Sequence, residues 1–123
     1  MRSLLLCAIL GVSIPVVPQS QGGKTGGPDC SGGWPTSMTL VQLKNAGLIV
    51  DNKDIDLSKT KTVRLASERV SNDLWHQVYH VTFTEKSGGR LEAIAVHDAS
   101  GEECSMTGVE VFVVSKHLNP ERK

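Results

Sequence analysis

Three of the four histidines lie in segments whose side chains alternate between apolar and polar: His76, His80 and His97. Imidazole changes charge near neutral pH and is a frequent metal ligand, so these residues are the strongest candidates for chemistry in the sequence. Two neighbouring imidazoles would suit Zn²⁺ or Cu²⁺, with a further ligand needed to complete the site. The pattern therefore predicts a candidate metal site at His80 and His97, with His76 as its third histidine.

Arg64 is expected beside His80 and His97, and its positive charge disfavours a bound cation there. The same three side chains would alternatively sense pH, because two imidazoles and an arginine resist joint protonation. They would also suit an anion or an acidic partner. The remaining interpretation is a solvated sheet face on which histidine is merely tolerated, and the sequence leaves these alternatives open.

The elements that would position these side chains are four antiparallel strands joined by hairpin turns. Period-two alternation predicts the strands over residues 60–70, 74–86, 90–98 and 109–115. Turn-forming residues follow the first strand at 71–73 and the second at Gly88-Gly89.

The turns also predict how the strands pair. A two-residue turn at Gly88-Gly89 would place Phe83 opposite Ile94, and a three-residue turn at 71–73 would place Leu65 opposite Tyr79. In that register Arg64, His80 and His97 form one row across three strands, with Cβ atoms of opposed residues about 5 Å apart.

A helix is expected before the strands, over residues 38–46. Thr39 and Gln42 have the spacing of a capping box, while Gly47 and Leu48 are typical of a Schellman ending. The fold class predicted is therefore α+β: one short N-terminal helix packed on a four-stranded antiparallel β-meander, with one disulfide.

The N-terminal residues 1–22 are typical of a cleavable signal peptide, with Arg2 followed by an apolar run and a small-residue exit. The alternative is a membrane anchor, but the apolar run of about 15 residues falls short of the roughly 20 that span a bilayer. Residues 23–33 are expected to form a flexible glycine-rich leader, and residues 34–123 a single domain.

Cysteine usage follows from this prediction. Cys7 would leave with the signal peptide, and Cys30 and Cys104 would pair in an oxidising compartment. Closing so long a loop is worth about 4–5 kcal/mol in the chain-entropy model. The alternative is two free thiols in a reducing compartment.

Charge and motif content exclude several function classes. Lys and Arg number 13 and Asp and Glu number 13, so the chain has no basic excess to favour nucleic acid or an anionic membrane. No cofactor motif is recognised. His97, Asp98 and Ser100 are the residue types of a hydrolase triad, but triad members come from separate segments. We therefore expect no cofactor and no enzymatic activity.

The hairpin that runs from Tyr79 through Gly89 to Gly101 resembles the paired strands of PepSY domains, which occur in exported bacterial proteins and are often inhibitory modules. The resemblance does not extend to the helix, so no site residue follows from it. One helix on an antiparallel meander is also similar in outline to cystatin-like inhibitors. The Gln77-Val78 stretch, however, lacks the glycine that completes their QxVxG motif.

These observations favour a small exported non-enzymatic binding module: an inhibitor, immunity or accessory protein of the bacterial envelope, periplasmic or secreted. The expected partner is another protein, with the chain itself a monomer or a weak dimer paired through an open sheet edge. Its candidate binding residues are Arg64, His80, His97, Glu102 and Glu103, the last two in the long loop after the third strand. The alternatives are a metal- or pH-responsive periplasmic protein and, last, a small secreted hydrolase.

Overall fold

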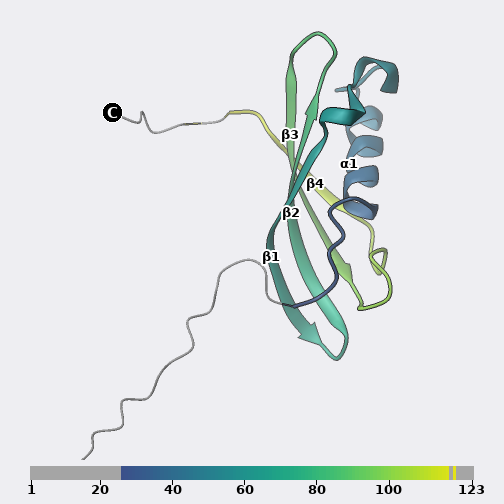
Figure 1. Cartoon of the computed structure of the whole chain (residues 1–123), viewed down its shortest axis with the longest axis vertical. Helices are drawn as coiled ribbons and strands as arrows, with labels where there is room; N and C mark the ends of the chain where they lie inside the picture. Colours follow the sequence, from purple (N-terminus) through teal and green to yellow (C-terminus); the bar gives the residue numbers. More distant parts are fainter. Residues whose placement is uncertain (1–25, 117, 119–123) are drawn as a thin grey trace, which may run out of the picture.

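The computed structural model describes residues 26–116 and residue 118 of the 123-residue chain. The predicted signal peptide at 1–22 lies outside the described residues, and the predicted leader enters them at Gly26. Figure 1 shows two layers, one helix lying across one face of an antiparallel sheet. The predicted α+β fold, with one helix and a four-stranded meander, is confirmed.

The helix, α1, spans Trp34–Asn45 and begins earlier than predicted. Gly33 precedes it in a non-helical conformation, and Pro35 occupies the first turn, where its missing N–H costs nothing. Thr39 lies inside the helix, where it is fully buried and its hydroxyl donates to the carbonyl of Pro35 at 2.6 Å. The predicted capping box is therefore wrong.

The predicted Schellman ending of α1 is confirmed. Gly47 has a φ of +77°, the left-handed conformation that favours glycine. Its N–H donates to the carbonyl of Lys44, and the N–H of Leu48 donates to that of Leu43, both at 3.0 Å. These two bonds satisfy carbonyls that would otherwise lack partners at the helix end.

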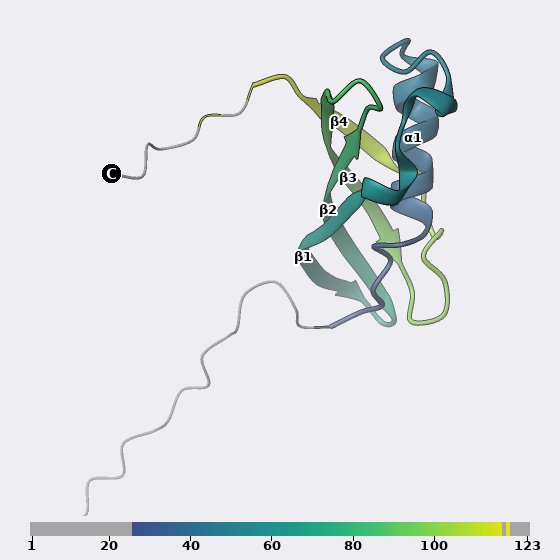
Figure 2. The same ribbon diagram turned by 45° about the horizontal axis from the view of Figure 1, so that its top comes forward.

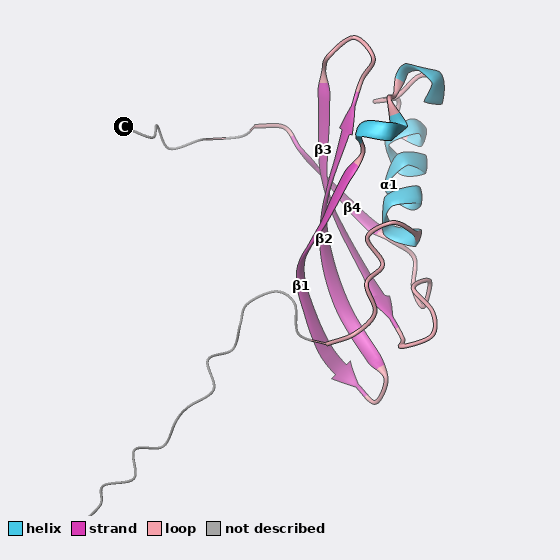
Figure 3. Cartoon of the chain, viewed as in Figure 1, coloured by secondary structure: helices cyan, strands magenta, loops and turns pink. Residues whose placement is uncertain are grey.

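Two single-turn 3₁₀ helices, at Asn52–Asp54 and Leu57–Lys59, lead from α1 to the sheet. The sheet then follows in the order β1-β2-β3-β4, coloured as strand in Figure 3. Its strands are β1 (Lys61–Ser71), β2 (Leu74–Thr84), β3 (Arg90–Ala99) and β4 (Glu110–Val114).

The β2–β3 turn differs from the prediction. Glu85 donates its N–H to the carbonyl of Gly89 at 2.7 Å, and Gly88 takes the left-handed φ of +98°. The loop therefore has three residues and places its glycine where a three-residue hairpin requires it. As a result Phe83 pairs with Leu91 rather than Ile94. The register of β3 therefore differs from the predicted one by three residues. Because three is an odd number, every side chain of β3 lies on the face opposite to the one predicted.

An irregularity in β1 moves a second predicted residue. Glu68 pairs with His76 as predicted, but the register changes between Arg64 and Ala66. Arg64 then pairs with Tyr79, which faces the helix, in place of the predicted Leu65. A bulge of this kind inserts one unpaired residue and re-aims those beyond it.

The core lies between α1 and the sheet. Leu43 of the helix packs against Tyr79 and Phe83 of β2, and all three side chains are almost completely buried. Beneath the helix β3 presents small side chains, including Ala95 and Ala99. Small residues let a helix approach a sheet closely, and Figure 2 shows α1 lying along this face of the sheet.

The predicted disulfide is confirmed. Cys30 and Cys104 are joined with their Cα atoms 5.8 Å apart, which ties the segment before α1 to the loop between β3 and β4. Among residues 26–116 and 118, no helix is long and apolar enough to cross a membrane.

Candidate functional site

The predicted row of Arg64, His80 and His97 does not form. The changed β3 register places His97 opposite Gln77 on the helix side, and the β1 bulge turns Arg64 to that side as well. His80 stays on the other face, between Val63 and Ile94. The interpretation of these three residues as one metal, pH or anion site is therefore wrong.

His97 is a buried structural residue. Its side chain is 2% exposed, and its Nδ1 lies 2.8 Å from the carbonyl oxygen of Cys104. Because a carbonyl only accepts, Nδ1 donates its proton there and leaves Nε2 unprotonated. Burial holds the pKa of His97 below its usual value, despite the opposing effects of these hydrogen bonds and of Asp98. The imidazole is therefore neutral near pH 7.

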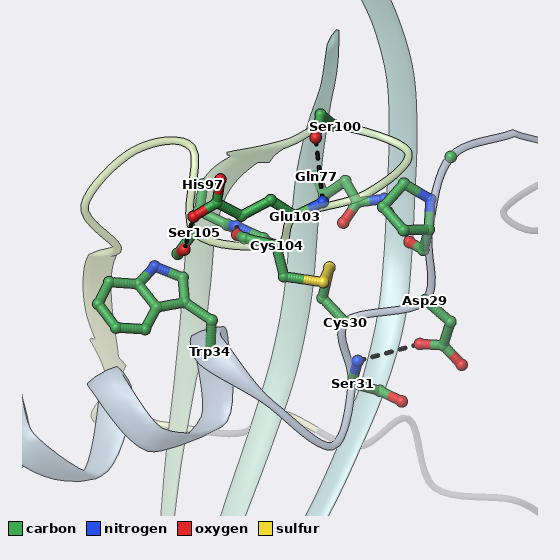
Figure 4. Close-up of a disulfide and its surroundings, with 12 residues drawn as sticks. Asp29, Cys30, Ser31, Trp34, Gln77, His97, Ser100, Glu103, Cys104 and Ser105 are labelled. Carbon is green, nitrogen blue, oxygen red and sulfur yellow. Dashed lines mark hydrogen bonds between the residues drawn. A yellow bond between two sulfur atoms is a disulfide. The ribbon is translucent and has the colours of Figure 1, made fainter. Parts of the chain in front are cut away.

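Side chains from both layers surround the disulfide (Figure 4). His97 and Gln77 approach it from the sheet, and Trp34 approaches it from the helix. Trp34 donates its indole N–H to the carbonyl of Thr107 at 3.1 Å, which closes the end of the core over the loop. Figure 4 also shows Ser100 bonded to the backbone of Glu103, so the loop carrying Cys104 is internally held.

A chain of hydrogen bonds anchors the residues before the helix to the sheet. Cys30 donates its N–H to the Tyr79 hydroxyl at 2.9 Å, and that hydroxyl donates to the side-chain oxygen of Gln77 at 2.9 Å. Gln77 in turn donates its side-chain N–H to the carbonyl of Pro28 at 2.8 Å. Burial raises the pKa of Tyr79, so its hydroxyl stays protonated to serve as this donor.

Arg64 also forms hydrogen bonds to the residues before the helix. Its guanidinium donates to the carbonyl of Pro28 at 3.0 Å and lies 3.5 Å from those of Gly26 and Gly27. Ser67 adds a bond from its hydroxyl to the carbonyl of Gly26 at 2.9 Å. The predicted leader is thus fixed to the sheet from Gly26 onward, and Arg64 helps to position it.

The face of the sheet that points away from α1 is called here the open face. Its central row crosses all four strands through Val63, His80, Ile94 and Phe112. Val63 on the outer strand β1 is 43% exposed and Phe112 on the outer strand β4 is 52% exposed.

A second row of the open face adds to this apolar surface. Val78 pairs with Val96, and Ala66 and Glu110 flank them on the outer strands. Both valines are partly exposed. The two rows together form what is called here the apolar strip, with His80 as the polar residue among them: Val63, Val78, Ile94, Val96 and Phe112.

The remaining histidines of the strands are paired with acids on the open face. His76 lies 2.6 Å from a carboxylate oxygen of Asp98, and His80 lies 3.7 Å from one of Glu92. His76 and His80 are separated by four positions along one strand, so they do not adjoin each other. Within the part of the chain that the structure describes, no group of three or more His, Cys, Asp or Glu side chains is placed to hold a metal ion.

One end of the open face is acidic. Glu68 lies beside the His76–Asp98 pair, and Glu110 lies in the adjoining row. The predicted contact residues Glu102 and Glu103 are exposed in the loop that follows β3 at this same end. This loop is held to the β1–β2 turn, since Gly101 donates its N–H to the Asp73 carboxylate at 2.9 Å.

The opposite side of the molecule carries a hollow of about 420 Å³ between α1 and the start of β1. Leu40, Leu57 and Phe83 form its apolar lining, and hydroxyl groups supply the polar part. Two of these hydroxyls, of Thr36 and Thr62, bond to each other at 2.7 Å. Because its lining residues carry no charge, the hollow offers an anionic or cationic ligand no counter-ion.

The hydrolase arrangement is not formed by the residues suggested for it. His97 faces the helix while Asp98 faces the open side, where it pairs with His76. The Ser100 hydroxyl accepts the backbone N–H groups of Glu102 and Glu103.

Sequence patterns missed the apolar part of the open face. Ile94 and Val96 were expected in the core because the predicted turn at Gly88-Gly89 placed them opposite Phe83 and Val81. The signal for the correct assignment is the small-residue series Ala93, Ala95 and Ala99, which alternates with them. Such a series fits the side of a strand that a helix covers closely.

Comparisons of the chain with protein-family models, with curated proteins and with solved structures found no match.

Proposed function

We propose that this chain is a small exported binding module that holds another protein against its open face. The observation that carries the proposal is the apolar strip through Val63, Ile94 and Phe112, which crosses the sheet with its two ends about half exposed and Ile94 partly exposed. Contiguous exposed apolar surface rimmed by charge is typical of interaction sites. Aromatic side chains such as Phe112 are enriched in protein interfaces relative to the rest of the surface.

Charge on the open face specifies the partner further. Glu68 and Glu110 border one end of the apolar strip, and the exposed Glu102 and Glu103 extend that acidic border. A complementary partner presents an apolar patch with lysine or arginine on one side. Such complementarity raises the rate of association and fixes the orientation of the complex.

Export is part of the proposal. The signal-like residues 1–22 and the Cys30–Cys104 disulfide both fit an oxidising compartment outside the cytoplasm. In the periplasm or outside the cell, a module of this size would act as an inhibitor, an immunity protein or an accessory subunit. The residues of the proposed surface lie in strands or in a loop held by hydrogen bonds, and an ordered surface loses less conformational entropy on binding.

The test is capture of partners from the native envelope or culture fluid by the full chain and by two matched variants. Val63→Glu places a charge in the apolar strip, whereas Val41→Glu changes a valine of nearly equal exposure on α1 (43% and 45%). We expect Val63→Glu to reduce the recovery of the captured protein at least tenfold, since a buried unpaired charge is costly. Val41→Glu should leave it unchanged.

Thermal unfolding of both variants serves as the control for folding. A captured protein that binds Val63→Glu as well as the unchanged chain would contradict use of the open face. Repeated capture of no protein at all from the native compartment would contradict the binding function itself.

A further inference from the structure

The two outer strands of the sheet differ in how well they are protected. β1 is charged along its length, with Lys61, Glu68 and Arg69, and a bulge interrupts its register. Charges and bulges are the features by which proteins prevent a free edge from pairing with another chain. β1 is therefore protected against edge pairing.

β4 lacks this protection. Its sequence from Glu110 to Val114 contains one charge and otherwise only valine and phenylalanine. Phe112 on the open face and Val113 on the helix side are 52% and 47% exposed, so neither face of the strand is covered at this point. β-branched and aromatic residues on a regular free edge favour pairing with a further strand.

We propose that β4 pairs with β4 of a second copy of this chain, antiparallel and about a two-fold axis at Val113. An axis there is possible in a closed dimer because the same strand edge serves both copies. The pairing would join the two sheets into one continuous sheet. It would also place the two open faces side by side.

Charge complementarity selects this register and this partner. Pairing centred on Val113 sets Glu110 of each copy opposite Lys116 of the other, and Lys116 is exposed just beyond the end of β4. Phe112 then faces Val114 of the second copy on the open side. Two opposite-charge pairs thus enclose two apolar pairs, each type stabilising for directly opposed residues.

A register centred on Phe112 instead would set Glu110 opposite Val114 and leave Lys116 without its acidic neighbour. It keeps the backbone pairing but loses both charge pairs. The Val113-centred register is therefore the more stable of the two.

Sedimentation equilibrium of the full chain, purified with its disulfide intact, tests the proposal. We expect a dimer whose dissociation constant rises about tenfold in Glu110→Lys and in Lys116→Glu, since each substitution sets like charges opposite each other twice per dimer. The double variant Glu110→Lys/Lys116→Glu should restore the constant to within about threefold. Restoration by a charge exchange requires that the two residues meet across the interface.

A second pair of variants tests the edge itself. Val113→Lys places two lysines together at the two-fold axis and should abolish the dimer, whereas Val41→Lys changes an equally exposed valine on α1 (47% and 45%) and should not. Far-ultraviolet circular dichroism confirms that each variant is folded.

Two results would overturn the inference. One is a chain that remains monomeric up to about 0.5 mM, well above the range expected for a specific contact of this kind. The other is a dimer that Val113→Lys and Glu110→Lys leave intact. The proposed function fails separately, because Val63→Glu alters the open face without touching β4.

Discussion

The two faces of this sheet are built from adjacent residues of the same strands, yet they differ in almost every physical property. On the helix side β3 contributes Ala95 and Ala99, which are fully buried, and β2 contributes Tyr79 with its hydroxyl bonded on both sides. On the open side the neighbouring Ile94 and Val96 are larger and partly exposed. On β3, therefore, Ala95 and Ala99 lie beneath the helix, whereas Ile94 and Val96 lie on the open side.

This contrast shows that size alone does not assign a residue to the core. α1 lies close to the sheet, so the strand beneath it must present small side chains or be pushed away. The polar groups on the helix side bond within the protein. Gln77, Tyr79 and Arg64 are hydrogen-bonded to the segment that precedes α1. The open side has the exposed carboxylates of Glu68 and Glu110 toward one end.

Loss of the disulfide should have the largest effect on stability, and it changes the helix side of the sheet alone. Replacing Cys30 and Cys104 together with serine should lower the free energy of unfolding by about 4–5 kcal/mol, because the unfolded chain regains the entropy of the open loop. Urea unfolding of the oxidised chain and the double variant measures this difference. A loss of less than about 1 kcal/mol would show that the hydrogen bonds of residues 26–30 hold the segment without the covalent tie.

The same substitution on the two faces should have different costs. Ala95→Leu adds volume under the helix and should lower the free energy of unfolding by about 1–3 kcal/mol, because a packed core resists extra methylenes. Ala66→Leu adds the same volume to the exposed side of β1 and should change stability by no more than about 0.5 kcal/mol. Urea unfolding of both variants compares them directly. Equal costs would contradict the assignment of the two faces.

The smallest effect on the free energy of unfolding should come from a change of pH. Because burial lowers the pKa of His97 below its usual 6.5, the unfolded chain binds more protons than the folded chain below that pH. The stabilising contribution is therefore complete above pH 6.5 and is lost as the pH falls from there toward the folded-state pKa, by at most about 1.4 kcal/mol per pH unit. Unfolding free energies measured between pH 5 and 7.5 give this slope.

His97→Gln is the control for the pH effect, since glutamine does not titrate. The variant should be less stable overall, because it disturbs the bond to the Cys104 carbonyl. Its slope between pH 5 and 6.5 should nevertheless be shallower than that of the unchanged chain. An equal slope would assign the pH dependence to other groups.

Most elements of the fold could be predicted from local patterns. Alternation located all four strands, with the largest error at the end of β2. Gly47 and Leu48 marked the end of α1 by the chemistry of one turn. The Cys30–Cys104 pairing followed from cysteine count and compartment. The strands and the helix end depend on residues that are near one another in sequence. The disulfide follows because only two cysteines remain once the predicted signal peptide is removed. None of these predictions needed knowledge of how the core packs.

The candidate site could not be predicted in the same way. The position of His97 depends on whether the β2–β3 loop has two residues or three, and Gly88-Gly89 is compatible with both. A change of register by an odd number of residues exchanges the faces of β3, so one local ambiguity moved His97 into the core and Ile94 out of it. Similarly, the bulge before Ala66 sent Arg64 to the helix side.

The sequence by itself therefore determined which segments are helix and strand, where α1 ends and which cysteines pair. Only the tertiary structure decided which side of each strand faces the helix, because the length of the β2–β3 loop and the bulge in β1 set the register. That choice removed Arg64 and His97 from the predicted site and exposed the apolar strip through Val63 and Phe112. A strand's alternation divides its residues into two sets, and packing against the helix assigns one set to the interior.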